Sequence, residues 1–339
     1  MDAHRDDVRL VRDRDRVPAL DELGASARVG LDGVLGALNR QARPAEVPAP
    51  AARWGFAWND QDSRSRRWYP QGISTSDDRG ESGGRDLVCV SWYDRGAGRG
   101  GGKGARVTFV DLTDRDGPRY RHVLLVDASV AGAGGVSLAP VRVHAGGIVW
   151  RGPYLYVAGT RRGVGVFRLD DILRVSAYGY PYVLPLSFWY TARTAEGAEQ
   201  LRYSFLSLDQ TASPAHLVAG EYGVNGRSTR LARFEIDGRT SLLRGADESR
   251  PATLHAGGVE HMQGATVVDG TYYVTASAGR FRRGDLWVGE PGRLRRRARV
   301  LPIGPEDIAY RPSGDELWSV TEYPGRRFVF AMDRAALTP

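Results

Sequence analysis

Polar side chains recur in this sequence where a repeated pair of short apolar segments begins. Gln71, His144, Gln263 and Glu306 each stand just before or at the first segment of such a pair. Carboxyl and imidazole groups exchange protons near neutral pH when their surroundings shift their pKa values. We expect Glu306 to act as a general acid, His144 to take the opposite role, and the amides to orient a substrate. The strand register is uncertain by one residue, so the catalytic residue at this position is either Gln263 or His261.

Aromatic and charged residues flank the same segments, mostly after the second segment of a pair. Two Glu-Tyr pairs occupy equivalent places, which favours an acid–base cluster. The residues expected to bind the substrate are Tyr69, Trp92, Tyr93, Arg202, Glu221, Tyr222, Glu322 and Tyr323. For each single residue the alternative is a structural role, in which polar side chains hydrate a channel without taking part in chemistry.

The apolar pairs are repeats of one hairpin. HAGGIVWRGPYLYVAG from His144, MQGATVVDGTYYVTAS from Met262 and PEDIAYRPSGDELWSV from Pro305 share the pattern, and weaker copies begin at Pro70 and Tyr203. Five copies, each followed by enough chain for four antiparallel strands, predict an all-β fold, a five-bladed β-propeller. The last copy has room for three strands, so residues 54–60 should supply the fourth and close the ring. In this arrangement the beginnings of first strands and the ends of second strands share one rim.

Residues 1–52 differ from the rest of the chain. Apolar residues at helical spacing between residues 17 and 41, followed by three prolines, predict a short N-terminal helical extension and a Pro-rich linker. The propeller is then expected over 53–339. The first 16 residues lack the apolar run of a secretory signal, and no run of 18 apolar residues occurs, so we expect a cytoplasmic protein without a membrane span.

We expect no cofactor, with one alternative: a divalent metal held by His144, His261 and Glu306. The chain contains no H-E-x-x-H or EF-hand pattern, and the glycine-rich segment 96–104 lacks the ending of a P-loop. The single cysteine excludes an intrachain disulfide and a cysteine-rich zinc site. Three further histidines show no partners in the sequence: His4, His122 and His216.

The formal net charge of +7 invites a nucleic-acid interpretation. Lys103 is the only lysine among 47 basic residues, a bias typical of GC-rich coding. Arginines in the rim loops could steer an anionic substrate, but solvated turns explain them better. The arginine-rich run at 293–299 fits an exposed edge strand, so we do not expect nucleic acid as a partner.

Several segments resemble a group of little-characterised, mostly secreted actinobacterial β-propeller-like proteins. They include WYPQGI from Trp68, HAGGIVW from His144, PIGPEDI from Pro302 and LWSVTEYPGRR from Leu317, within residues 54–332. The resemblance implies a propeller-like body and no established activity. Because no signal peptide is expected in this chain, the departure from that group suggests recruitment to a new task such as tailoring a specialised metabolite.

Two other propeller groups serve as comparisons. Five-bladed glycosidases carry an acid where this chain has Gln71, which argues against glycoside hydrolysis. Virginiamycin B lyase-like propellers use a channel histidine and glutamate with magnesium, and His144 and Glu306 are similar in kind only. The sequence therefore favours a redox-neutral enzyme of cyclase, lyase or isomerase type acting on a medium-sized organic molecule. The alternative is a non-catalytic binding propeller for a glycan or a protein partner.

Overall fold

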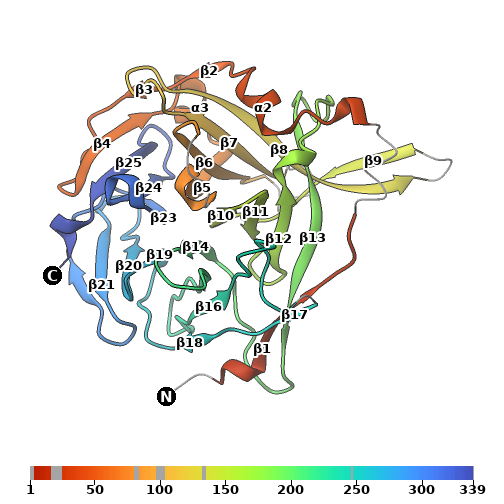
Figure 1. Cartoon of the computed structure of the whole chain (residues 1–339). Helices are drawn as coiled ribbons and strands as arrows, with labels where there is room; N and C mark the ends of the chain where they lie inside the picture. The colour runs from red at the N-terminus through yellow and green to blue at the C-terminus, as the bar shows by residue number, and fades with distance from the viewer. Residues whose placement is uncertain are drawn as a thin grey trace.

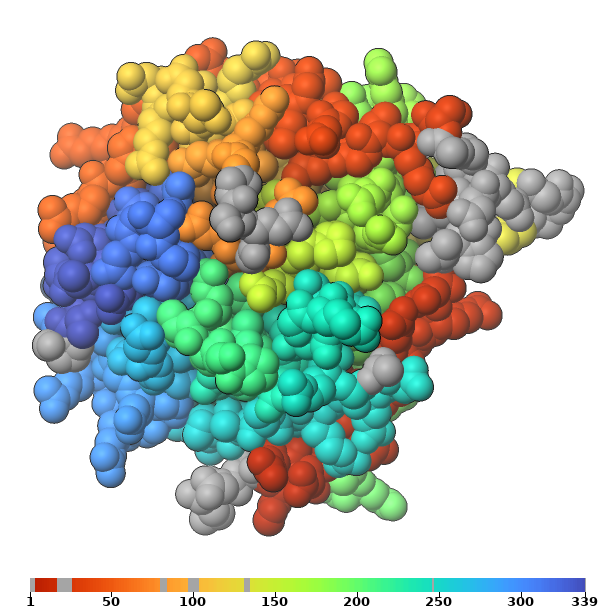
Figure 2. All heavy atoms as spheres, viewed as in Figure 1, coloured from red at the N-terminus to blue at the C-terminus, as the bar shows by residue number. Residues whose placement is uncertain are grey.

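The fold is all-β and propeller-like. The computed structural model describes residues 4–16, 25–79, 84–96, 104–131, 135–245 and 247–338. Its strands form antiparallel meanders that follow one another around a common centre (Figure 1). The chain runs around this centre in sequence order, from orange through green to blue in Figure 2.

Each meander has four strands in antiparallel order, and its first strand is innermost. Meander 1 comprises β5 (Trp68–Thr75), β6 (Leu87–Asp94), β7 (Ala105–Asp111) and β8 (Arg119–Ala131). Meander 2 comprises β10 (Ile148–Arg151), β11 (Tyr154–Ala158), β12 (Gly163–Arg168) and β13 (Val183–Thr194). Meander 3 comprises β14 (Phe205–Asp209), β15 (His216–Gly220), β16 (Leu231–Glu235) and β18 (Thr253–His255).

Meander 4 comprises β19 (Met262–Val268), β20 (Thr271–Ala276), β21 (Asp285–Gly289) and β22 (Arg295–Arg297). Meander 5 comprises β23 (Pro305–Arg311), β24 (Glu316–Thr321), β25 (Phe328–Asp333) and β4 (Ala52–Ala57). The outer strands β8 and β13 also pair in parallel, which joins meanders 1 and 2 into one sheet.

Hydroxyl side chains connect several meanders to the next around the centre. Ser91 Oγ donates to Ala145 O at 2.7 Å between meanders 1 and 2. Ser207 Oγ donates to Ala265 O between meanders 3 and 4. Because these donors and acceptors are buried, the bonds hold each meander against its neighbour.

Gly147 and Asp307 connect further inner strands of the ring. A Cβ on Gly147 would clash with the backbone nitrogen of Leu206, so only glycine lets the start of β10 approach β14 this closely. Asp307 is fully buried, and its carboxylate accepts the N–H of Ile73 at 3.2 Å, which joins meander 5 to meander 1. Between meanders 4 and 5, Thr275 Oγ1 donates to the carbonyl oxygen of residue 306 at 2.6 Å. The first strands therefore form a continuous, tightly packed ring.

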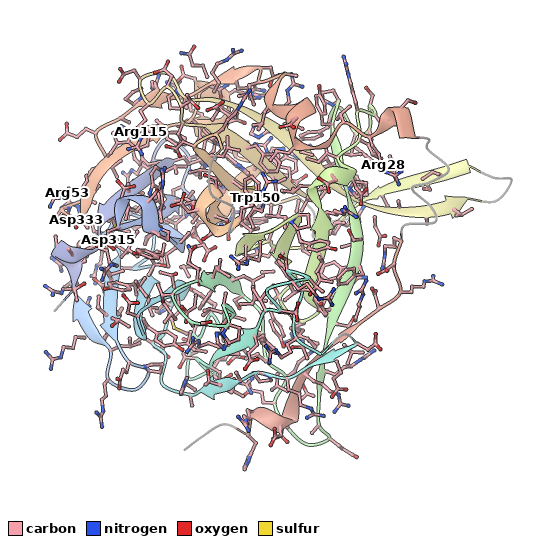
Figure 3. All side chains as sticks on the ribbon, viewed as in Figure 1. Arg28, Arg53, Arg115, Trp150, Asp315 and Asp333 are labelled. Atoms are coloured by element: carbon pink, nitrogen blue, oxygen red, sulfur yellow. The ribbon has the colours of Figure 1, made fainter. Side chains whose placement is uncertain are left out.

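The strand β4 joins the two ends of the chain in one meander. It pairs antiparallel with β25, so that Ala57 lies opposite Phe328. At the outer edge of this pair Arg53 and Asp333 form an ion pair of 3.2 Å, at the left of Figure 3. The N-terminal β4 thus supplies the outer strand that the C-terminal part lacks.

The predicted helical extension is not confirmed. The N-terminal segment forms strands at sheet edges: β1 (Val8–Arg12) pairs with β13, β2 (Arg40–Gln41) with β8, and β3 (Arg43–Pro44) with β4. Edge strands offer unpaired N–H and C=O groups, and these segments pair with them. The helix α2 (Gly30–Leu35) has only six residues, and part of the predicted helical region, residues 17–24, lies outside the described residues.

The remaining elements are short. They are η1 (Arg5–Asp7), η2 (Ala25–Ala27), α3 (Asp60–Arg64), η3 (Ser76–Arg79), β9 (Gly135–Pro140), η5 (Leu169–Asp171), β17 (Glu248–Ser249), η6 (Pro312–Gly314) and η7 (Ala335–Leu337). In the described part of the chain, no helix has the length and apolar character that crossing a bilayer requires.

Candidate functional site

A cavity of about 540 Å³ lies where the inner strands begin and the second strands end. All five meanders contribute to its wall, and each contributes different side chains. The lining residues are Gln71, Tyr93, His144, Gly146, Thr160, Ser204, Tyr222, Gln263, Glu306 and Glu322. The cavity therefore lacks the repeated, equivalent binding surfaces that a symmetric ring would give.

Three of the lining side chains occupy equivalent β-bulges. The pairing of β5 with β6 shifts between Pro70 and Ile73, that of β19 with β20 around Gln263, and that of β23 with β24 around Glu306. A bulge inserts an extra residue and redirects a side chain away from the regular alternation. In this way Gln71, Gln263 and Glu306 reach the cavity from strands whose other side chains pack in the core.

The Glu306 carboxyl is the most unusual group in the cavity. The residue is only 2% exposed, and among the described residues none donates a hydrogen bond to its side chain. Burial, together with the nearby carboxyls of Glu322 and Asp307, raises the pKa of Glu306 well above its ordinary value. Glu306 consequently keeps its proton to a higher pH than an ordinary glutamate does.

Glu322 has a different electrostatic environment. Burial raises the pKa of this half-buried carboxyl, but a hydrogen bond from Tyr323 and the charges of Arg327, Arg280 and Arg95 act against that shift. Arg327 is fully buried and donates from Nε to the Glu322 carbonyl oxygen at 2.7 Å. The pKa of both carboxyls is raised, but only Glu322 has positive charges that oppose the rise, so Glu306 is the better proton donor of the two.

The Arg327 guanidinium anchors this side of the cavity to α3. Its Nη1 donates to the Asp62 carbonyl oxygen at 2.6 Å, and its charge lies 4.8 Å from the centre of the Tyr69 ring. Arg95 donates to the Tyr69 hydroxyl at 2.9 Å. Tyr69 is 4% exposed and therefore supports the wall from behind, as a contact of Tyr93, whose ring centre is 5.7 Å away.

His144 stands at the cavity mouth against Tyr93. The ring centres are 4.3 Å apart, and the imidazole is exposed on its cavity side. Tyr93 and the surrounding rim cover the rest of the ring, and this partial desolvation lowers the pKa of His144 to about 4. The imidazole is therefore neutral at pH 7 and able to accept a proton. Burial also raises the pKa of the Tyr93 phenol to about 12, so Tyr93 keeps its hydroxyl proton.

The choice between His261 and Gln263 is resolved by the bulge. Gln263 lines the cavity. His261, two residues earlier in the chain, does not line it, and its Nδ1 lies 3.1 Å from the Tyr222 hydroxyl. His261 has a positive φ of 63°, which turns it out of the strand. It therefore contacts Tyr222, which lines the cavity, and is not itself among the lining residues.

Three expected substrate contacts have structural roles, and their assignment is corrected. Trp92 is fully buried in the core of meander 1. Glu221 is also fully buried, and Arg230 Nη2 lies 2.9 Å from its carboxylate. Arg202 donates to the Ser228 carbonyl oxygen at 3.0 Å, which ties one rim loop to the next.

Tyr323 also lies outside the cavity lining, although it is close to it. Its ring packs over Gly304, where a side chain larger than hydrogen would collide with it. Its hydroxyl bonds to the Glu322 carboxyl, so its influence on the cavity is electrostatic. Tyr323 is therefore a neighbour of the site and not part of its wall.

Thr160 and Ser204 also line the cavity, at rim positions that the repeated hairpins indicate, although they are not among the residues expected to act on the substrate. Thr160 follows the second strand of meander 2, as Tyr93 ends that of meander 1. Ser204 precedes the first strand of meander 3, a place comparable to that of Gln71. This equivalence places them on the rim, but hydroxyl groups are too common on loops to mark a site by themselves.

His122 does have partners, contrary to the expectation from sequence. Its Nδ1 lies 2.6 Å from Thr108 Oγ1 and its Nε2 lies 3.0 Å from an Asp62 carboxylate oxygen. Arg106 and Tyr120 also bond to that carboxylate. All of these side chains are buried, so the network fixes α3 against meander 1 and does not reach the cavity.

The alternative of a metal held by His144, His261 and Glu306 does not fit the arrangement of side chains. Within the described residues no three His, Cys, Asp or Glu side chains come close enough to share a metal ion. His261 instead directs its Nδ1 at the Tyr222 hydroxyl. We assign no metal to these residues.

Comparisons with known proteins show similarity at the level of architecture. No protein-family model and no curated protein matches the chain. It is similar to the structures of a gluconolactonase from Xanthomonas campestris (14% identity, 86% of each chain, TM-score 0.38) and of a glutaminyl cyclase from Myxococcus xanthus (13%, 87% of this chain and 94% of that one, TM-score 0.35). It is also similar to the WD40 β-propeller domain of Doa1 (9%, 89% and 96%, TM-score 0.37). Similarities this weak carry no argument about binding or catalysis in this chain.

Proposed function

We propose that the protein is a five-bladed β-propeller enzyme that catalyses a redox-neutral lyase, cyclase or isomerase step on a medium-sized organic molecule. Each of the five meanders is then one blade, and the substrate occupies the central cavity. The observation that carries the proposal is Glu306, a buried carboxyl that opens into the cavity without a hydrogen-bond partner among the described residues. Strongly perturbed carboxyls in a cavity are typical of acid–base sites.

In this mechanism Glu306 and His144 exchange protons with the substrate. Glu306, whose raised pKa favours the protonated form, donates its proton from the carboxyl oxygen to a substrate atom. Neutral His144 accepts a proton from another substrate atom, and the two groups return to their starting states by exchange with water. Gln71 and Gln263 supply amide groups that orient the substrate, and Tyr93 supports the His144 ring.

The unlike contributions of the blades favour catalysis over a repetitive binding surface. One asymmetric set of an amide, an imidazole, a hydroxyl, a second amide and a carboxyl surrounds the cavity. The alternative is a non-catalytic propeller that binds a glycan or a protein partner. It predicts ligands that bind and are released without chemical change.

The test is turnover detected in mixtures of natural metabolites. Purified protein is incubated with fractionated metabolite extracts, and mass spectrometry follows compounds whose loss matches the gain of an isomer or an elimination product. We expect Glu306→Gln and His144→Ala each to lower turnover by about 10²- to 10⁴-fold. Full turnover by both variants would refute the assignment, and retention of unchanged compounds would favour the binding alternative.

A further inference from the structure

The charge of the cavity wall differs from that of the whole protein. The chain has 47 basic residues and a formal net charge of +7. Among the described residues that line the cavity there are two carboxyls, Glu306 and Glu322, and neither an arginine nor a lysine. A cavity with this lining in an arginine-rich protein selects against anions at its centre.

The nearby positive charges serve Glu322 and leave Glu306 uncompensated. Burial raises the pKa of both carboxyls; at Glu322 the charges of Arg327, Arg280 and Arg95 oppose that rise, whereas at Glu306 the carboxyls of Glu322 and Asp307 add to it. The other titratable groups around this pair are three phenols and one imidazole, those of Tyr93, Tyr222, Tyr323 and His144. None of them supplies a positive charge at neutral pH, because the phenols and the imidazole are uncharged.

We propose that the cavity binds an organic amine as its ammonium ion, with the charged nitrogen against Glu306 and the rings of Tyr93 and Tyr222 beside its carbon substituents. Aromatic rings attract organic cations, and a buried carboxylate requires a partner of opposite charge. One uncompensated carboxyl matches one positive charge. The inference rests on the proposed function, because it names the substrate class of the same site: the amine nitrogen is the substrate atom that receives the Glu306 proton, and Glu306 is the carboxylate in the resulting complex.

The proton balance of binding follows from the free state of Glu306. If a neutral amine enters, the carboxyl proton moves to its nitrogen, and a carboxylate–ammonium pair results. If the ammonium ion enters, the Glu306 proton leaves to solvent. Binding of an ammonium ion therefore releases about one proton and strengthens as pH rises, by up to about tenfold per pH unit while Glu306 remains protonated in the free protein.

The experiment uses isothermal titration calorimetry of the full chain with benzylamine as the probe. Benzyl alcohol is the neutral control of similar size, and benzoate is the anionic control. We expect benzylamine to bind at least about tenfold more tightly than either control at neutral pH. Its affinity should rise between about pH 5 and pH 7, and buffers of different ionisation enthalpy should report the released proton.

Variants connect the effect to one carboxyl. Glu306→Gln should lower the benzylamine affinity by about tenfold or more at neutral pH, remove its pH dependence and leave benzyl alcohol unaffected. Glu306→Asp keeps a carboxyl and should retain the pH dependence. Glu290→Gln, in the exposed turn after β21, makes the same chemical change away from the cavity and should bind as the wild type does.

Equal binding of benzyl alcohol and benzylamine would overturn the inference, and so would an unchanged pH dependence in Glu306→Gln. Because binding requires no turnover, the two proposals fail separately. Preference for benzylamine with full turnover in Glu306→Gln and His144→Ala would refute the enzyme mechanism and keep the ammonium site. Lost turnover without preference for benzylamine would refute the ammonium site alone.

Discussion

Replacing Glu306 by glutamine should make the protein more stable at neutral pH and leave it unchanged in acid. The folded protein holds a proton on this carboxyl that the unfolded chain releases above its ordinary pKa of about 4.3. Between that value and the raised pKa of the folded state, the folded protein binds more protons, so its stability falls as pH rises. A glutamine amide at this position carries no proton that could be lost, which removes this contribution.

The magnitude follows from the proton difference. One proton contributes about 1.4 kcal/mol per pH unit, so two pH units above the unfolded value correspond to about 2 to 3 kcal/mol. Glu306 is 2% exposed, and solvent therefore screens little of this cost. Near pH 4 the unfolded chain also keeps most of this proton, so the free energies of unfolding of the two proteins should nearly agree.

Urea denaturation followed by tryptophan fluorescence, at a series of pH values from about 4 to 7, measures this difference. Asp78, whose pKa burial raises to about 7, titrates in both proteins, so the comparison between the proteins reports Glu306 together with its electrostatic coupling to Asp307. The exposed Glu290→Gln variant is the matched control. If the curves for wild type and Glu306→Gln run parallel over the whole range, Glu306 is not protonated in the folded state and the reasoning fails.

Three further predictions concern the frame of the site. Gly147→Ala should destabilise the fold by about 1 to 3 kcal/mol or more in urea denaturation, because its Cβ would meet the backbone of Leu206. The control Gly238→Ala, with open space around it, should change the free energy of unfolding little. Equal effects of the two substitutions would contradict the close packing of the inner strands. Arg327→Met should cost about 2 to 5 kcal/mol in thermal unfolding, since it leaves two buried carbonyl oxygens without their donor, and an unchanged Tm would show that this anchor is dispensable. His144→Ala should change the free energy of unfolding by less than about 1 kcal/mol, because the ring is exposed, so a larger loss would show that its effect on turnover is structural.

Several cavity residues were predictable because their positions follow from the repeated hairpin pattern, which is visible in short stretches of sequence. Repeated hairpins placed Gln71, His144, Gln263 and Glu306 at comparable points of the chain. Alternation along a strand is a local property with a period of two, so repeated copies are visible in the sequence. The same alternation did not reveal that Trp92 is buried in the core and does not face the cavity. Which face of a strand is buried depends on the neighbouring segments that pack against it.

The sequence by itself determined an all-β chain of repeated hairpins and most of the polar groups that those hairpins bring to one end of a ring. The tertiary structure decided between His261 and Gln263, because a bulge depends on how two strands pair and not on the residues of one strand. It also decided that Asp62 meets His122, which is 60 residues away in the chain. Above all, it left Glu306 without a compensating charge while three arginines gather around Glu322, because burial and electrostatic balance arise only when distant segments pack together.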